Sequence, residues 1–358
     1  MADVTDGCDR RTFLGTAAMS IAAAGVDSLG CATMAAGDSR QLTALGDATA
    51  WLQSPPLTTA SLLGTPVLIQ FGTYTCINWL RTLPYVRAWR RRYAPGLVVI
   101  GVHTPEFAFE KDVDNVRRAL QRLSVAFPVV LDNAYAIWRA FDNHSWPALY
   151  LLDRGRVCYR HFGEGEYERS EQAIRRLVAE MGSEGNRNDN GGGAPVAATS
   201  FELPADWQNL RTPEIYLGHD RVEGFASPGG SSLAKRRAYR VPARLELNRW
   251  ALDGEWTMER QPVVLNSAAG RIVCRFHARD VHRVMGPTHR GGQVHFRVSV
   301  DGQPPGAARG LDVDEHGTGT AADLRLYQLI RQRGSIVDRT FEIAFLDAGV
   351  EAFSFTFG

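Results

Sequence analysis

The chain has 358 residues, with 40 Lys and Arg against 39 Asp and Glu and a formal net charge of +1. Hydrophobic residues make up 44% and charged residues 22% of the sequence, proportions that exclude a disordered chain or a membrane channel. The balanced charge provides no basic field for nucleic acid, and a prior of about 150 residues per domain predicts two domains.

The first residues are typical of an export signal. The hexapeptide Asp9–Leu14, with the pair Arg10-Arg11, resembles the twin-arginine consensus, and a mildly apolar run of small residues follows at 15–26. We therefore expect a twin-arginine signal peptide over residues 1–36, an extracytoplasmic product in the periplasm or cell envelope, and no transmembrane domain after signal removal. The structural alternative is a chance arginine pair before an Ala-rich helix. Lipid anchoring at Cys31 is a second alternative, although its lipobox is incomplete.

Cys76, Cys158 and Cys274 remain after the signal is discarded. An odd, widely spaced set does not predict a disulfide scaffold. Cys158 and Cys274 lie in the strand-like runs 156–162 and 271–277, so we expect both to be small core or face residues.

Cys76 lies at a different kind of position. The apolar run 66–71 predicts a central strand, residues 72–75 break it, and apolar residues at helical spacing begin at Ile77. Cys76 is therefore predicted on the first turn of a helix, where unpaired backbone N–H groups and the macrodipole stabilise a negative sulfur. Such positions lower the pKa of a thiol from about 8.5 into a range of about 3.5–7.5. We predict that Cys76 is the reactive nucleophile.

The rest of this segment alternates between strand and helix patterns. Strands are predicted at 97–102, 128–131, 148–152 and 157–162, and helices at 112–123, 134–141 and 166–180. The turn signal Asp153–Arg156 permits a hairpin between the last two strands. This order predicts an α/β thioredoxin-like fold.

The segments 71–84 and 101–107 resemble the TlpA/DipZ-like branch of thioredoxin-fold proteins, or redoxins. Pro84, eight residues after Cys76, matches the proline that kinks the active-site helix of this family. Trp146-Pro147 matches the family's cis-proline loop, and the resemblance implies that this loop faces the thiol and lines a substrate groove. The predicted thioredoxin-like domain comprises residues 41–180.

Two positions depart from the family pattern. Trp79 stands where the family has the second cysteine of Cys-x-x-Cys, and Gln70 stands where the family has a buried acidic residue. Intramolecular resolution of a mixed disulfide is therefore chemically unavailable. Because the family usually has a tryptophan at the position of Gly72, we expect the ring of Trp79 to fill the same space.

Three functions remain open. The favoured one is a thiol-disulfide oxidoreductase that uses Cys76 for monothiol exchange with an external resolving thiol. The alternatives are a redox-inactive binding protein for a protein partner or glycan, and a one-cysteine thiol peroxidase; for the latter Thr73 fits Pro-x-x-x-Thr-x-x-Cys, but Ile69 takes the proline position. His103 either tunes the sulfur or caps a loop, and Glu106 and Glu110 are interpreted as solvated loop charges.

The predicted site is made of few residues. They are Cys76 as nucleophile, Thr73, Thr75, Ile77, Asn78 and Trp79 in the motif, Trp146 and Pro147 in the groove, and His103 and Gln70 as tuning residues. We expect no cofactor and no metal, because His277, His282, His289 and His295 lack a tight ligand spacing. The expected partners are protein thiols or disulfides and a separate electron donor or resolving thiol, because the chain lacks the membrane electron-transfer domain of full DipZ-like proteins.

The composition changes after residue 180. Residues 181–200 are predicted to form a flexible Gly/Asn/Asp-rich linker. Short strand-like runs then recur at 244–247, 262–265, 271–277, 294–300, 324–330, 340–346 and 350–357, which predicts an all-β sandwich, jelly-roll-like, over residues 205–358.

The C-terminal half also resembles a family domain. Thr212–Gly218, Asp301-Gly302, Arg325–Leu329 and Phe355–Gly358 are similar to the domain that follows the thioredoxin unit in DipZ-like proteins. That domain resembles a carbohydrate-binding module, which implies a glycan partner. Trp250 and Trp256, flanking an expected turn, are interpreted as core residues rather than as a sugar platform.

Overall fold

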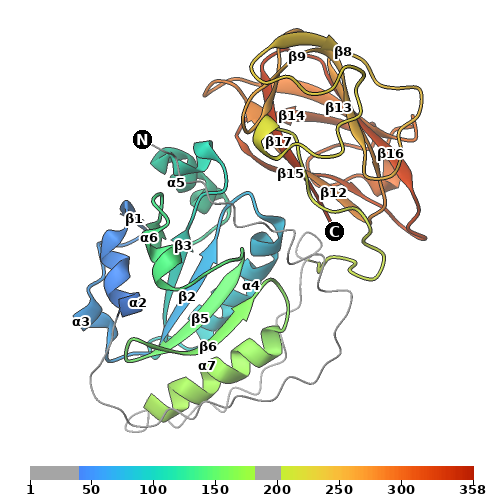
Figure 1. Cartoon of the computed structure of the whole chain (residues 1–358). Helices are drawn as coiled ribbons and strands as arrows, with labels where there is room; N and C mark the ends of the chain where they lie inside the picture. The colour runs from blue at the N-terminus through green and yellow to red at the C-terminus, as the bar shows by residue number, and fades with distance from the viewer. Residues whose placement is uncertain (1–39, 182–202) are drawn as a thin grey trace. The chain divides into compact units, whose positions relative to one another are not determined.

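A computed structural model describes residues 40–181 and 203–358 (Figure 1). They form two compact units divided after residue 202, and each unit is described by itself. The predicted signal peptide over residues 1–36, Cys31 and almost all of the predicted linker over 181–200 lie outside the described residues. Within the two described ranges, no helix combines the length and the apolar character needed to span a membrane.

The N-terminal unit is built on one six-stranded sheet, ordered β1-β4-β3-β2-β5-β6. Its strands are β1 (Ala50–Leu52), β2 (Val67–Gly72), β3 (Val98–His103), β4 (Val129–Leu131), β5 (Ala148–Asp153) and β6 (Arg156–Phe162). Strands β2, β3 and β4 are parallel, whereas β5 runs antiparallel to β2 and pairs with β6 in a hairpin. Every residue of β2 is buried, as its uninterrupted apolar run predicted.

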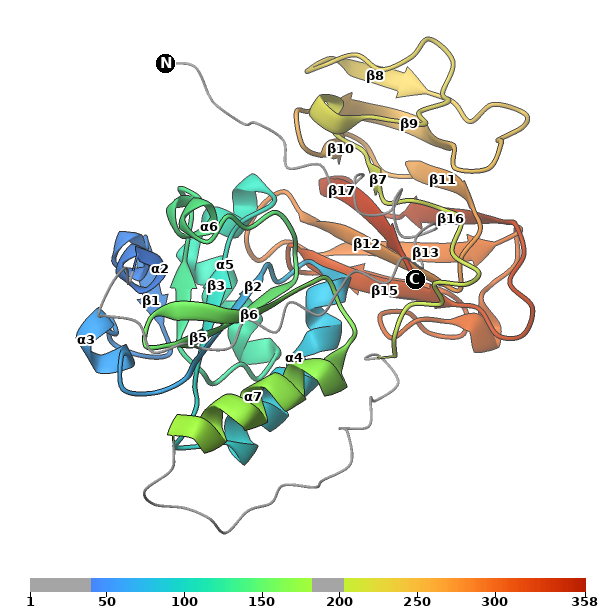
Figure 2. The same cartoon turned by 60° about the horizontal axis from the view of Figure 1, so that its bottom comes forward.

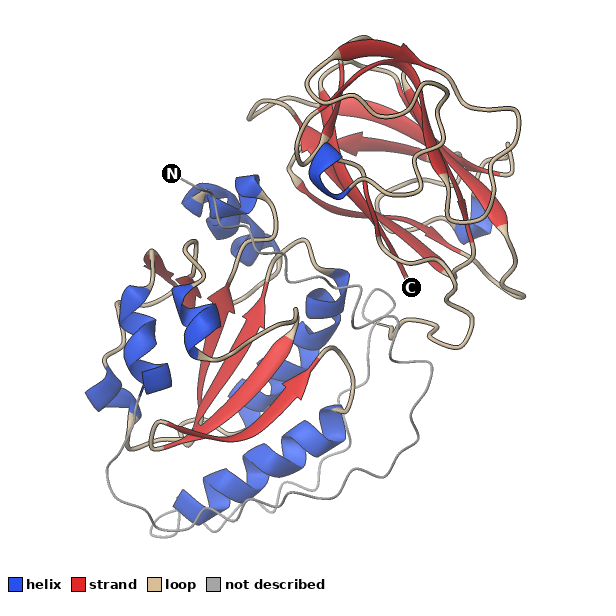
Figure 3. Ribbon diagram, in the orientation of Figure 1, coloured by secondary structure: helices blue, strands red, loops and turns tan. Residues whose placement is uncertain are grey.

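Helices flank this sheet (Figure 3). They are α2 (Arg40–Thr43), α3 (Thr59–Leu62), α4 (Ile77–Arg92), α5 (Val113–Arg122), α6 (Ala136–Ala140) and α7 (Tyr167–Met181), with the 3₁₀ turns η1 (Ala44–Asp47) and η2 (Ala108–Lys111). Helices α4 and α7 lie side by side (Figure 2), because Tyr85 stacks on Tyr167 with 3.5 Å between ring centroids and Arg92 forms an ion pair with Glu171. The unit has the α/β thioredoxin-like fold that the sequence predicts.

The C-terminal unit is all β apart from the 3₁₀ turns η3 (His219–Arg221) and η4 (Gly306–Ala308). Its strands are β7 (Ile215–Tyr216), β8 (Arg236–Tyr239), β9 (Trp250–Met258), β10 (Val263–Leu265), β11 (Arg271–Phe276), β12 (Asp280–Pro287), β13 (Val294–Val300), β14 (Thr318–Ala321), β15 (Arg325–Arg331), β16 (Arg339–Phe345) and β17 (Val350–Phe357). Nine of these strands are hydrogen-bonded in the order β14-β13-β16-β11-β9-β10-β17-β12-β15, while β7 pairs with β17 and β8 pairs with β9.

Strand β9 belongs to both layers of this sandwich. Its first half, Trp250 to Asp253, pairs with β11, whereas its second half pairs with β10. Gly254 lies at the change of partner with a φ of +95°, which a residue with a side chain rarely adopts. The strand can therefore bend and close two layers around one apolar core.

Two sequence expectations for this unit are wrong in detail. Residues 244–247 form no strand; Leu245 instead packs beside Ala251 and Val273 from a loop. Trp250 and Trp256 do not flank a turn, because both lie on β9, and both are fully buried. Their assignment to the core is confirmed.

Candidate functional site

Cys76 lies in the turn between β2 and α4. It is the N-cap residue of α4, one position before the first helical residue, with an extended backbone (φ −82°, ψ 113°). Its carbonyl accepts a hydrogen bond from the N–H of Leu80 at 3.0 Å, and its own N–H donates to the carbonyl of Thr73 at 3.1 Å. The sulfur is therefore carried by the end of the helix where backbone donors are unpaired and the helix dipole favours negative charge.

The loop of Trp146 and Pro147 lies next to this sulfur. The Cys76 Sγ is 3.9 Å from the carbonyl oxygen of Trp146, and the Trp146-Pro147 peptide bond is cis. The Trp146 indole donates to the carbonyl of Thr104 at 3.0 Å and packs against Trp138 at 4.4 Å between ring centroids. The structure thus brings together Cys76, the predicted nucleophile, and Trp146 and Pro147, the predicted groove residues. Cys76 is only 3% exposed, so a reagent has little direct access to it.

Trp79 fills the space beside the end of β2. A Cβ atom on Gly72 would lie 2.0 Å from Cδ1 and 2.2 Å from Nε1 of the Trp79 indole, far inside van der Waals contact. Trp79 is only 6% exposed. The ring therefore occupies the volume that a side chain at position 72 would need, as expected from the family's usual tryptophan there.

Gln70 lies fully buried on β2. Its Nε2 donates to the hydroxyl of Thr82 at 2.5 Å, and this hydroxyl donates to the carbonyl of Trp79 at 2.7 Å. The amide therefore anchors the helix through Thr82 and supplies no ionisable group. Thr82 is a part of this arrangement that sequence reasoning did not single out.

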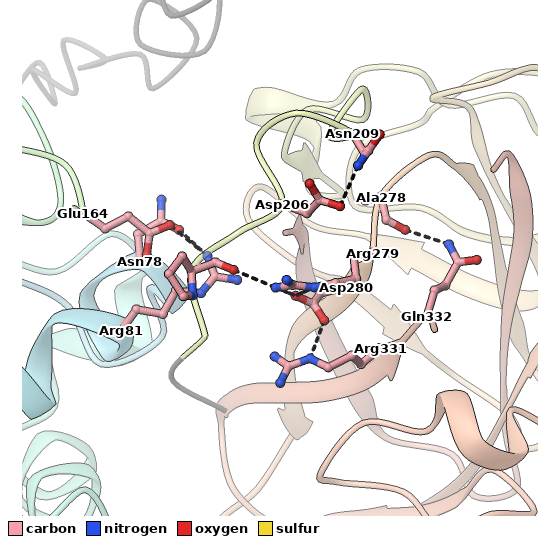
Figure 4. Close-up of polar contacts among 11 residues, drawn as sticks. Asn78, Arg81, Glu164, Asp206, Asn209, Ala278, Arg279, Asp280, Arg331 and Gln332 are labelled. Atoms are coloured by element: carbon pink, nitrogen blue, oxygen red, sulfur yellow. Dashed lines mark hydrogen bonds and ion pairs between the residues drawn. The ribbon is translucent and has the colours of Figure 1, made fainter. Parts of the chain in front are cut away.

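The remaining motif residues differ in their surroundings. Thr73, Thr75 and Ile77 are buried, and Asn78 is half-buried. Asn78 accepts a hydrogen bond at 3.3 Å from Arg81, whose guanidinium forms a 3.0 Å ion pair with Glu164 (Figure 4). The Arg81–Glu164 pair ties the first turns of α4 to the segment that precedes α7.

Glu110 is not a solvated loop charge, and the expectation for it is wrong. Its side chain is fully buried and accepts from the Thr75 hydroxyl at 2.5 Å and from the backbone N–H groups of Glu106 and Phe107 at 2.5 and 2.9 Å. Burial, followed by the nearby charge of Glu106, raises the pKa of the Glu110 carboxyl. No capping signal in the sequence pointed to Glu110, because Phe107, and not Ser, Thr, Asp or Asn, stands at the N-cap position of η2.

His103 caps this same loop. Its Nε2 lies 3.0 Å from the carbonyl oxygen of Glu110, and its ring stacks on Tyr74 at 5.6 Å between centroids. Burial lowers the pKa of His103 to about 4, so the imidazole is neutral at pH 7 and its Nε2 carries the donated hydrogen. The loop-capping interpretation fits these contacts, and the ring of His103 stacks on Tyr74, two residues before Cys76.

The other two cysteines lie on strands, as the sequence predicts. The Cys158 thiol is half-buried on β6 and donates to the carbonyl of Leu151 at 3.3 Å. Cys274 lies in the β-sandwich core, where burial raises the pKa of its thiol to about 12. Neither forms a disulfide among the described residues, and no group of metal-ligating side chains occurs in them.

The C-terminal unit carries a buried ion-pair cluster on β12. Asp280 receives hydrogen bonds from Arg279 at 2.6 Å and from Arg331 at 2.7 Å, as Figure 4 shows. Burial alone would raise the pKa of Asp280, but His282, Arg279 and Arg331 together hold it below its ordinary value. This cluster joins β12 to β15 and is structural.

Comparison with known proteins agrees with both units. Residues 212–358 match the family described as "Thioredoxin like C-terminal domain". Protein DipZ of Mycobacterium tuberculosis (strain CDC 1551 / Oshkosh) is 36% identical over 263 residues, which cover 72% of this chain. The chain spans only about a third of that relative, since the aligned part makes up 36% of DipZ.

Two further matches each cover little more than a third of the chain. The thiol-disulfide oxidoreductase YkuV of Bacillus subtilis (strain 168) is 28% identical over 133 residues, which cover 37% of this chain and 89% of that protein. A solution structure of a thioredoxin-like protein in the oxidized form is 28% identical, with a TM-score of 0.35, and the match covers 37% of this chain and 90% of that one. From its sheet order, its C-terminal family match and its similarity to DipZ, the chain has a thioredoxin-like N-terminal unit followed by a β-sandwich of the "Thioredoxin like C-terminal domain" family, and it is similar to DipZ over both units.

Proposed function

We propose that this protein is an exported thiol-disulfide oxidoreductase of the redoxin type that works through Cys76 alone. The observation that supports this most is the position of Cys76 at the N-cap of α4, with its Sγ 3.9 Å from the carbonyl of Trp146 in the cis-proline loop. The similarity to the thiol-disulfide oxidoreductase YkuV supports the same chemistry.

The proposed cycle has two exchange steps. The Cys76 thiolate attacks one sulfur of a protein disulfide, so that a mixed disulfide forms and one substrate thiolate leaves. An external thiolate then attacks the substrate sulfur of the mixed disulfide and releases Cys76. Overall, one disulfide and one external thiol become a new disulfide and a new thiol, and Cys76 is unchanged. Trp79 offers no thiol for the second step, so a small-molecule or protein thiol of the envelope must supply it.

The remaining parts of the proposal concern export and organisation. We propose a twin-arginine signal over residues 1–36, a thioredoxin-like domain at 41–180, a linker at 181–200 and a β-sandwich at 205–358. For the C-terminal domain we propose a glycan of the envelope as the partner, tested by co-sedimentation with cell-wall polysaccharide. Retention of this binding after deletion of residues 205–358 would contradict it.

The redox proposal is tested by site-specific alkylation. Iodoacetamide modification of Cys76 is followed by mass spectrometry from pH 5 to 10, with the peptide of Cys158 in the same digest as an internal reference. We expect an inflection below about pH 7 for Cys76, whereas a value near about 8.5 would contradict the proposal. A second arm measures exchange with oxidised glutathione, which should vanish in Cys76→Ser and persist in Cys158→Ser.

A redox-inactive binding protein is the second candidate, and one observation favours it. Cys76 is 3% exposed and the second-cysteine position holds the buried ring of Trp79. On this alternative, Cys76→Ser would leave partner binding unchanged, and no thiol of the protein would exchange with glutathione.

A further inference from the structure

The loop between β3 and α5 is bonded to the segment that carries the nucleophile. Glu110 on this loop accepts the hydroxyl hydrogen of Thr75, the residue directly before Cys76, at 2.5 Å. His103, at the other end of the loop, stacks on Tyr74. Two consecutive residues before Cys76 are therefore held by one loop.

The hydrogen-bond donors around Glu110 and its burial act on the charge of its carboxyl in opposite directions. One oxygen accepts from Thr75, and the other accepts from the backbone N–H groups of Glu106 and Phe107. Three donors directed at one carboxyl favour its charged form, whereas complete burial disfavours it. The effect of burial is larger than that of the donors, since the pKa of Glu110 lies above its ordinary value. The carboxyl therefore changes charge at a higher pH than a solvated glutamate.

The charged groups around this carboxyl come from several elements. Glu106 shares the loop and opposes its ionisation, and the neutral imidazole of His103 faces its backbone carbonyl. The groups whose charges act on neighbouring Tyr74 are Glu110 itself, Asp112 before α5, and Arg118 and Arg122 on α5. Gln70, on the sheet side of the motif, contributes no charge. Glu110 is thus the buried acid of this active-site region, in a different element from the family's.

We propose that Glu110 is a positioning residue that holds the Cys76 segment through Thr75 and that its ionisation opposes formation of the Cys76 thiolate. This rests on the proposed function, because it concerns the reactivity of the same sulfur. A negative charge held in a dry region beside the motif disfavours a second one on the sulfur. With Glu110 protonated, its hydroxyl can donate to the Thr75 oxygen, so the link to the motif persists while the opposing charge is lost.

The test compares pH profiles of Cys76 alkylation in four full-length proteins. Glu110→Gln keeps the shape and the hydrogen-bonding capacity but removes the charge. We expect its Cys76 inflection to move to lower pH, with alkylation about three- to tenfold faster below the wild-type inflection. Glu106→Gln removes a half-buried carboxylate from the same loop without touching Thr75, and should change the rate less than twofold.

Thr75→Val provides a second route if Glu110→Gln folds poorly. It removes one donor to Glu110 while keeping a β-branched side chain, so Glu110 should stay protonated to higher pH and Cys76 should again react faster. A Glu110→Gln profile that superimposes on the wild-type profile, or an equal effect of Glu106→Gln, would overturn the inference. If the wild-type Cys76 itself shows no inflection below about pH 8.5, the proposed function fails instead, so the two failures are distinguishable.

Discussion

The indole of Trp79 and the missing side chain of Gly72 fit together: a Cβ at residue 72 would lie 2.0 Å from Cδ1 of Trp79. The two positions are therefore coupled, and a side chain can be accommodated at only one of them without rearrangement. The position that holds the second cysteine in the family is therefore occupied here by a ring that packs against Gly72.

The coupling predicts a strong context effect for Gly72→Ala. In the wild-type background the added methyl group overpacks a buried site, and we expect a loss of about 1–3 kcal/mol in the free energy of unfolding. In a Trp79→Ala background the same change should cost much less, because the ring is gone. Denaturant unfolding of wild type, Gly72→Ala, Trp79→Ala and the double variant measures both costs in the free energy of unfolding. Gly64→Ala is the matched control, since nothing lies within 4 Å of a Cβ there. Equal costs in both backgrounds would show that the two sites are independent.

Restoring the dithiol alone should fail. Trp79→Cys leaves a cavity beside Gly72, and we expect a loss of about 3–5 kcal/mol and little activity in an insulin-reduction assay. A variant that also carries Gly72→Trp and Gln70→Asp refills the cavity and returns an ionisable group next to the new thiol. It should reduce insulin measurably faster than Trp79→Cys. Equal failure of both variants would count against this account of Trp79.

Acid should destabilise the N-terminal unit partly through His103. Burial lowers the pKa of His103 to about 4, so between pH 6.5 and 4 the unfolded chain binds a proton that the folded protein does not. The contribution of His103 to the free energy of unfolding therefore falls as the pH decreases, by about 3 kcal/mol in all. We expect the stability difference between wild type and His103→Gln to shrink from pH 7 to pH 4. Glu110 and Asp132 titrate in both proteins, so their effects cancel in this comparison. A stability difference between wild type and His103→Gln that does not change with pH would contradict the assignment to His103.

Arg283 on β12 should lower the stability of the β-sandwich. Its guanidinium is fully buried, lies 4.3 Å from the centre of the Phe355 ring, and has no hydrogen-bond partner among the described residues. Burial lowers the pKa of Arg283 to about 9. Arg283→Met replaces a desolvated charge by an apolar chain of similar length, and we expect about 1–4 kcal/mol of stabilisation in denaturant unfolding. Arg283→Ala, which leaves a cavity, should gain less, and a loss of stability in Arg283→Met would refute the argument.

The elements that sequence periodicity predicted well are those with uninterrupted apolar patterns. Strands β2, β3 and β5 lie within one residue of their predicted starts, because each is buried in the centre of a sheet and needs apolar side chains throughout. Strands β9 and β12 were missed. Both contain charged residues and a glycine, which interrupt the apolar pattern. Some of their charged residues are buried with partners from other strands, such as Asp280 of β12, which forms an ion pair with Arg331 of β15.

The sequence by itself determined the kind of fold and the place of Cys76 between a strand and a helix, because a buried strand, a break and an amphipathic helix are local patterns along the chain. It also determined that only one thiol stands in the motif. Only the tertiary structure decided that Trp79 covers Gly72 and that Glu110 is buried against Thr75. These relationships join residues from different elements, and burial and hydrogen bonding between such residues arise only when the sheet and its loops come together.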